Sequence, residues 1–239
     1  MNSKRYAMAA ILENVQTSEQ TKAEQLFSLL LRDNWQNNNG PILEMMIFMI
    51  DKYGLETCRL SSLPLLTHPL SVMQITADYA TEYGCLNTDT IIASLGHDLL
   101  DDGKISDEIL SQTFNSSVSK IIHSLTDYNK RFSGYKKEPS LDFWRTRKFM
   151  YITSLGDRLT QPWAKQMLLI AGADKLDNCG RITLESEQSQ RNVWNTSITN
   201  LDWYYQTFIE FLEKNLGGSL SVDLRQAYTK MAQSLKQII

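Results

Sequence analysis

Three features that the chain has little of restrict the class of protein. Its 239 residues include only three cysteines, which are scattered without CxxC spacing: Cys58, Cys85 and Cys179. This usage is typical of a reducing compartment and provides no thiolate metal site. The apolar run near the N-terminus is interrupted by Glu13, and the most apolar segment, residues 42–50, is too short to cross a bilayer. We therefore expect a cytoplasmic protein that does not enter a membrane.

An excess of basic charge is also lacking. The formal net charge is −3, with 24 basic and 27 acidic residues, so the chain is not expected to bind nucleic acid. It contains no P-loop, no GxGxxG or GxSxG motif, no repeats and no strand-like alternation of apolar and polar residues. The length fits one large domain or two small ones. Helical elements and less common motifs must therefore carry the function.

Helical spacing, capping residues and breakers predict helices along most of the chain. Asn87 or Thr88 can cap the helix predicted over residues 87–102 and Gly103 can close it, Ser106 caps a short helix after it, and Gly180 is the expected stop of the helix over residues 162–179. The predicted helices cover residues 1–35, 41–53, 69–83, 87–102, 117–130, 141–158, 162–179 and 192–216, with a last helix from residue 222.

The stretch 88–102, TDTIIASLGHDLLDD, concentrates reactive side chains. If it is one helix, its isoleucines and leucines form a core-facing stripe, while His97, Asp98 and Asp101 lie on the adjoining polar side. The helix dipole disfavours carboxylates in a last turn, so a bound cation would offset that cost. A solvated acidic helix end gives the same pattern, and these residues alone favour neither interpretation.

Two further candidates stand near predicted helix ends. His68 directly precedes Pro69, which fixes its place at a helix entrance, although a lone histidine there is more often a cap or a surface residue. Asp174 lies in an apolar helix and needs a partner, which could be Lys175, another basic residue or a metal. His123 is interpreted as structural, because no histidine or carboxylate precedes it by one helical turn.

Basic residues gather in two places that suit phosphate. The segment 130–139, KRFSGYKKEP, begins with Lys130 and interleaves bases with aromatic residues, a weak signal for nucleotide binding. The helix predicted over residues 141–158 carries Arg147 and Lys148. Either group could neutralise phosphate oxygens.

Together, His68, His97, Asp98 and Asp174 make a mixed nitrogen and oxygen ligand set that leaves metal positions open for water and a phosphate oxygen. This order, H…HD…D, resembles the HD-domain phosphohydrolases, and more closely the hydrolase domain of RelA/SpoT-type alarmone enzymes, especially their small stand-alone metazoan-type members. The resemblance covers roughly residues 40 to 235. Its motifs are T-H-P at 67–69, ASLGHDLLDD at 93–102 for A-x-L-x-H-D-x-x-E-D, T-D at 126–127, R-K at 147–148, and ADKLDN at 173–178.

The resemblance implies an all-α fold, an HD-domain helical bundle over residues 41–239, with residues 1–40 as an N-terminal helical extension. It implies that the four ligands hold a divalent metal, Mn²⁺ in the family, although such ligands accept other divalent ions. Asp101 and Asp102 stand for the family's Glu-Asp pair that handles the attacking water. The implied substrate-binding residues are Asn178, Lys175, Lys130, Arg147, Lys148 and Arg59.

The family removes the 3′-diphosphate from guanosine tetra- or pentaphosphate, a small-molecule nucleotide. Three departures bear on that substrate: Thr57 and Cys58 replace an Arg-Lys pair and displace Arg59, Thr196 and Asn200 replace an Arg and a Tyr, and Asp101 replaces Glu. The alternatives are therefore an HD hydrolase of another phosphorylated nucleotide and a non-catalytic nucleotide-binding sensor. The residues indicate no particular oligomeric state.

Overall fold

The computed structural model describes residues 40–54, 56, 65–127, 141–184 and 197–236. These residues form helices and turns, and no strand occurs among them, as the sequence predicts. None of the described helices is long and apolar enough to span a membrane. The helices are α3 (Gly40–Tyr53), α4 (Thr67–Ala80), α5 (Thr88–Leu95), α6 (Asp107–Thr113), α7 (Ser116–Leu125), α9 (Leu141–Gly156), α10 (Ala164–Leu184), α12 (Ile198–Asn215) and α13 (Gly218–Lys236).

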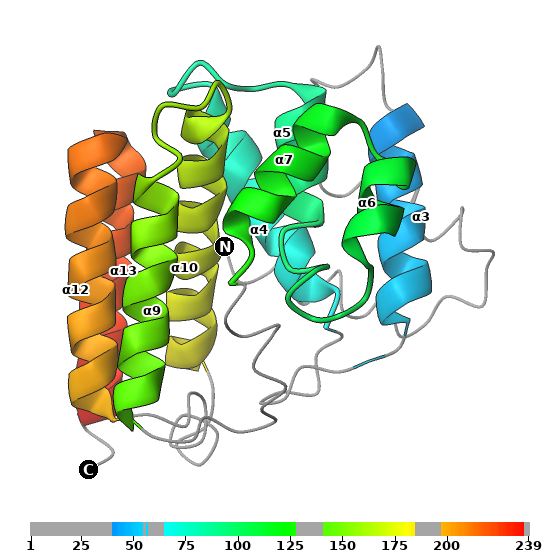
Figure 1. The fold of residues 1–239 in the computed structure, drawn as a ribbon. Coiled ribbons are helices and arrows are strands. Elements are labelled where there is room, and N and C mark those ends of the chain that lie inside the picture. The colour runs from blue at the N-terminus through cyan, green and yellow to red at the C-terminus, as the bar shows by residue number, and fades with distance from the viewer. Residues whose placement is uncertain (1–39, 55, 57–64, 128–140, 185–196, 237–239) are drawn as a thin grey trace.

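Helix α10 is the centre of the arrangement. It packs against α13 on one side and against α4, α5 and α7 on the other, so it joins two groups of helices. Figure 1 shows α9, α10, α12 and α13 side by side, with α4, α5 and α7 next to them and α3 and α6 beyond. A side chain in the middle of α10 is therefore placed where both groups meet.

A glycine allows the close approach of α10 to its neighbours. A Cβ atom on Gly172 would lie 2.8 Å from Leu220 Cδ2 of α13 and 3.0 Å from Leu212 Cδ2 of α12. Both leucines are completely buried, and almost every residue between Met167 and Ala173 is buried as well. This packing fixes α10 along its length, so residues that follow Gly172 occupy defined positions.

Several predicted caps are confirmed. The Asn87 side chain accepts a 2.8 Å hydrogen bond from the Thr90 amide at the start of α5, and Ser106 caps α6 by accepting from the Ile109 amide. These caps satisfy amide groups that the first turn of a helix leaves without a partner. The capping residues of these two helices could therefore be predicted from the sequence around each helix start.

The prediction of one helix over residues 87–102 is wrong. Helix α5 ends at Leu95, and Gly96 adopts φ −91° and ψ 7°, outside the helical region. Residues 96–103 then form consecutive turns, which close at Gly103 with φ +66° and a 2.9 Å hydrogen bond from the Lys104 amide to the Leu99 carbonyl. His97 and Asp98 lie in these turns, so the helix-dipole argument for a cation does not apply to them.

The predicted stop of α10 at Gly180 is also wrong. The helix continues to Leu184, because a glycine inside a helix costs only about 1 kcal/mol and the buried Cys179 and Ile182 pack on either side of it. Asp174 therefore lies in the helix interior rather than in its last turn. Helix α4 begins at Thr67, so His68 is in its first turn, and α13 begins at Gly218, four residues before the predicted start.

Other predictions concern residues outside those described. These are the helix over residues 1–35, the extension 1–40 apart from Gly40, the basic loop 130–139, the region of Thr57, Cys58 and Arg59, and Thr196.

Candidate metal centre

The four predicted ligands come together from three separate parts of the chain. His68 extends from the first turn of α4, His97 and Asp98 lie in the turns after α5, and Asp174 lies in the middle of α10. The contact between α10 and α4 brings side chains together that are more than a hundred residues apart in the sequence. Their assembly is therefore a result of the fold.

The ligand atoms converge on a small volume. The Nε2 atoms of His68 and His97 are 3.3 Å apart. Asp98 Oδ2 lies 3.5 Å from the first of these nitrogens and 3.3 Å from the second. Asp174 Oδ1 lies 3.3 Å and 3.9 Å from the same two atoms. One ligand atom each of His68, His97 and Asp98 falls within 4.8 Å of the others, a spacing at which they could hold one ion.

Each imidazole ring is oriented by an oxygen atom that lies against its Nδ1 atom. His97 Nδ1 lies 2.8 Å from the Ser94 carbonyl oxygen, and His68 Nδ1 lies 2.7 Å from Asp177 Oδ2. Because these oxygens accept hydrogen bonds, each Nδ1 carries a proton, which leaves Nε2 as the atom through which each ring would bind a metal. Such outer partners are characteristic of metal-binding histidines.

Asp177 was not identified from the sequence as a partner of His68. Its carboxylate is completely buried, and Arg181, one turn later on α10, also donates to it. Arg181 donates in addition to Thr67 Oγ1 at 3.2 Å, next to His68 in the chain. Asp177 and Arg181 thus join α10 to the start of α4 at the point where the ligand is held.

The electrostatics of the group favour a positive charge at its centre. Burial alone would lower the pKa of His68, but hydrogen bonds to Asp174, Asp177 and Asp98 raise that pKa well above its usual value. Burial would raise the pKa of Asp98, yet the two histidines hold it well below its usual value. Two imidazole nitrogens and two carboxylates facing one another match the ligand chemistry of a divalent transition ion.

Neighbouring residues on α10 hold the Asp174 carboxylate in place. Its Oδ2 forms an ion pair with Lys175, while its Oδ1 accepts a 2.6 Å hydrogen bond from Asn178 Nδ2 one turn away. Asn178, predicted to bind substrate, thus contacts a ligand carboxylate. Of the three partners considered for Asp174, the structure shows Lys175 and places the candidate ligands His68 and His97 beside the same carboxylate.

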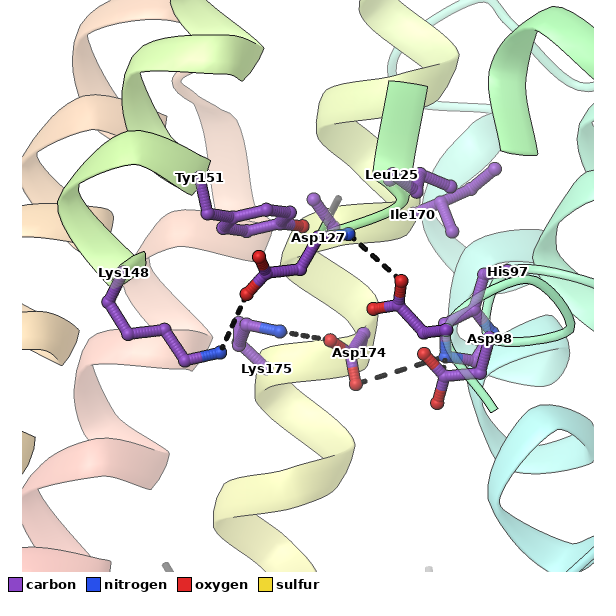
Figure 2. A pocket seen from close by; sticks show the side chains of 11 residues that line it. His97, Asp98, Leu125, Asp127, Lys148, Tyr151, Ile170, Asp174 and Lys175 are labelled. Atoms are coloured by element: carbon purple, nitrogen blue, oxygen red, sulfur yellow. Dashed lines mark hydrogen bonds and ion pairs between the residues drawn. The ribbon is translucent and has the colours of Figure 1, made fainter. Parts of the chain in front are cut away.

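A pocket opens beside the candidate ligands. Its volume is about 40 Å³, which suits a phosphate group or a few waters rather than a whole nucleotide. Figure 2 shows its charged side chains pointing toward one another from α9, α10 and the turns that follow α5 and α7. The lining residues are His97, Asp98, Asp101, Leu125, Asp127, Lys148, Tyr151, Ile170, Ala171, Asp174 and Lys175.

The two predicted catalytic carboxylates occupy different surroundings. Asp101 lines the pocket, and its Oδ1 accepts a 3.0 Å hydrogen bond from the Asp127 amide. Asp102 is exposed, does not line the pocket, and accepts a 3.0 Å hydrogen bond from the Tyr53 hydroxyl at the end of α3. The structure therefore brings Asp101, but not Asp102, to the pocket.

The basic residues predicted to bind phosphate also occupy different places. Lys148 and Lys175 line the pocket, whereas Arg147 is buried in an ion pair with Asp127, whose Oδ2 is also 3.7 Å from Lys148 Nζ. Arg147 thus orients a pocket carboxylate. Lys130 and Arg59 lie outside the described residues.

His123 lies apart from this centre. Its Nδ1 is 3.2 Å from Asp107 Oδ1, in agreement with a structural role.

Comparison with known proteins relates the chain to alarmone hydrolases. No protein-family model matches it. The chain is 27% identical over 146 residues, 61% of its length, to the guanosine-3′,5′-bis(diphosphate) 3′-pyrophosphohydrolase of Aquifex aeolicus, and it spans 18% of that protein. A solved structure described as "a metazoan ortholog of SpoT" that "hydrolyzes ppGpp and plays a role in starvation responses" superposes with a TM-score of 0.61 at 18% identity.

That superposition covers 84% of this chain and 99% of the solved one. The predicted all-α, HD-domain helical fold is thereby confirmed.

Proposed function

We propose that this chain is a metal-dependent phosphohydrolase that removes the 3′-diphosphate from guanosine tetra- or pentaphosphate, giving GDP or GTP and pyrophosphate. The observation that carries the proposal is the convergence of His68, His97, Asp98 and Asp174 next to a pocket that also contains Asp101 and two lysines. The names of the relative and of the structural neighbour support the substrate. We assign the activity to residues 41–239 and place the protein in the cytoplasm.

The metal would be held by the four converging side chains, and we propose Mn²⁺. When bound, it supplies positive charge that polarises a phosphate oxygen and makes a nearby water easier to deprotonate. The residues that surround it supply orientation: Asp177 and the Ser94 carbonyl hold the rings, while Lys175 and Asn178 hold Asp174.

The other pocket residues would handle water and phosphate. Asp101 accepts a proton from the water that attacks the phosphorus bonded to the 3′ oxygen. The bond between that phosphorus and the 3′ oxygen breaks, and the 3′ oxygen takes up a proton. Lys148 and Lys175 bind the diphosphate oxygens as charge accumulates on them.

The charge of the pocket supports dependence on a cation. Four carboxylates line it against two ammonium groups, from Lys148 and Lys175. Even with His97 protonated, the carboxylates outnumber the cationic groups, so the lining is negative and would repel a phosphate. A divalent ion removes that net charge, so the substrate should bind after the metal.

A different phosphorylated nucleotide is the alternative substrate. Asn200, which stands where the family has a tyrosine for phosphate contacts, is buried in the first turn of α12. The pocket suits a phosphate better than a nucleoside, so we propose that the base binds outside it. A sensor without turnover is less favoured, because a binding protein does not need a carboxylate at the position of Asp101.

The test is release of pyrophosphate with and without Mn²⁺ from a panel of nucleotides: guanosine and adenosine 3′,5′-bis-diphosphates, a dinucleotide phosphate and a 5′-triphosphate. Selective, metal-dependent cleavage of the guanosine compound is the expected result. Preference for another member would change the substrate and keep the chemistry. Metal-loaded protein that cleaves none of them would contradict an enzymatic function.

A further inference from the structure

The two pocket lysines rest on aromatic rings as well as on carboxylates. Lys148 Nζ lies 5.9 Å from the centroid of the Tyr151 ring and 5.3 Å from that of Tyr204. Lys175 Nζ lies 5.6 Å from the Tyr151 centroid and 6.0 Å from that of Phe208. Ammonium groups at these distances are attracted to the negative faces of the rings.

Tyr151 is the ring that both lysines share. Among the cation–π contacts of the described residues, Tyr151 is the ring that takes part with both Nζ atoms. It lies on α9 one turn after Lys148, lines the pocket, and is 7% exposed. Figure 2 shows Tyr151 and Lys148 extending from α9 toward Lys175 on α10.

We propose that Tyr151 is a positioning residue that holds the ammonium groups of Lys148 and Lys175 together as one binding site for the diphosphate of the substrate. This inference rests on the proposed function, because it concerns the substrate of the same pocket. No motif of the sequence analysis includes Tyr151.

The carboxylates alone do not explain a joint site. Asp127 lies next to Lys148 and Asp174 pairs with Lys175, so each carboxylate holds one lysine. A further carboxylate between the lysines would accept their N–H groups and repel phosphate. A ring attracts both ammonium groups and occupies none of their three N–H donors, which leaves their charge directed at a ligand.

The ring also restricts side chains that are otherwise flexible. A lysine loses much rotamer freedom when it binds a ligand, and prior contact with a ring reduces what remains to be lost. Because the effect acts on the bound phosphate, loss of the ring should weaken substrate and pyrophosphate binding more than it slows the chemical step.

The test compares Tyr151→Met, which keeps a long apolar side chain but removes the ring, with Tyr151→Phe, which keeps the ring but removes the hydroxyl. Pyrophosphate binding to Mn²⁺-loaded protein is measured by titration calorimetry, followed by KM and kcat. Tyr151→Met should weaken pyrophosphate binding and raise KM about tenfold, with a smaller change in kcat and the same Mn²⁺ affinity. Tyr151→Phe should keep most of the wild-type pyrophosphate affinity and a KM near that of the wild type.

Tyr228→Met is the matched control. Tyr228 is 8% exposed and stacks on Tyr205 without lining the pocket, so its loss should lower stability and leave pyrophosphate affinity unchanged. If Tyr151→Met does not fold, Tyr151→Leu replaces it.

Three results would overturn the inference: wild-type pyrophosphate affinity in Tyr151→Met, an equal loss in Tyr151→Phe, or a parallel fall in Mn²⁺ affinity. Wild-type protein that binds pyrophosphate through Tyr151 but does not cleave the guanosine alarmone would contradict the proposed substrate and support the inference.

Discussion

His68 and His97 face each other through their Nε2 atoms, 3.3 Å apart, while the Nδ1 atom of each ring lies against an oxygen acceptor. With a proton on Nδ1 alone, the two inward lone pairs would repel each other and the neighbouring carboxylates. A cation at the centre, whether a metal ion or a proton on Nε2, converts that repulsion into attraction. The geometry of this pair is the basis of the metal-site proposal.

Removal of a ligand should remove the metal. His97→Ala and Asp174→Ala should each lower Mn²⁺ affinity at least tenfold, measured as metal content after gel filtration or by titration calorimetry. The control is His123→Ala, because His123 pairs with Asp107 outside the centre. Full metal content in both ligand variants would contradict the assignment.

Loss of the Asp177 carboxylate, which lies against His68 Nδ1, should weaken metal binding indirectly. Asp177→Asn keeps the size of the side chain and removes the charge that orients the His68 ring, so Mn²⁺ affinity should fall about 10- to 100-fold. Asp107→Asn changes the other aspartate–histidine pair and should leave metal binding unaltered. Equal affinities in the two variants would show that Asp177 has no role in metal binding.

Substitutions of the neighbouring carboxylates Asp101 and Asp102 should differ in their effect on turnover. Asp101 faces the pocket, so Asp101→Asn should lower kcat about 100-fold or more with the metal retained. Asp102→Asn should also lower turnover and keep the metal, but to a smaller extent, because Asp102 contacts Tyr53 outside the pocket. Single-turnover rates on metal-loaded protein measure both, and an unchanged rate for Asp101→Asn would remove its proposed role.

A stability prediction concerns the start of α13. Gly218 has φ +70°, and a Cβ atom there would collide with the Tyr83 hydroxyl, which also accepts from the Leu220 amide. Gly218→Ala should therefore lower the free energy of unfolding by about 2–3 kcal/mol, measured by urea denaturation. Gly84→Ala is the control: Gly84 has φ +63° but open space around it, so only about 1 kcal/mol should be lost.

Local signals predicted much of the helical framework. Asn87 and Ser106 were recognisable as caps because a cap acts within three residues of its own position. Helical spacing and the absence of alternation predicted helices along most of the chain, and the resemblance implied the all-α class. The candidate ligands stood out as histidines and carboxylates near predicted helix ends, and the resemblance then implied that they form one metal site.

Other features depend on contacts that a local pattern does not contain. Helix α5 ends just before Gly96, whereas α10 continues through Gly180. Both residues are glycines, so the packing around each one, rather than the residue type, decides whether the helix ends. Asp177 reaches His68 across 109 residues, and Tyr151 meets Lys175 between two helices. These contacts arise only when α10 packs against α4 and α9 lies beside the pocket.

The most direct test of the central claim is a titration of metal-stripped protein with Mn²⁺, in which pyrophosphate release from guanosine 3′,5′-bis(diphosphate) and bound metal are measured in the same samples. The proposal predicts that turnover rises with Mn²⁺ and saturates at one ion per chain, and that Asp174→Ala shows neither saturable binding nor turnover. Pyrophosphate release by stripped protein at the full rate would contradict it.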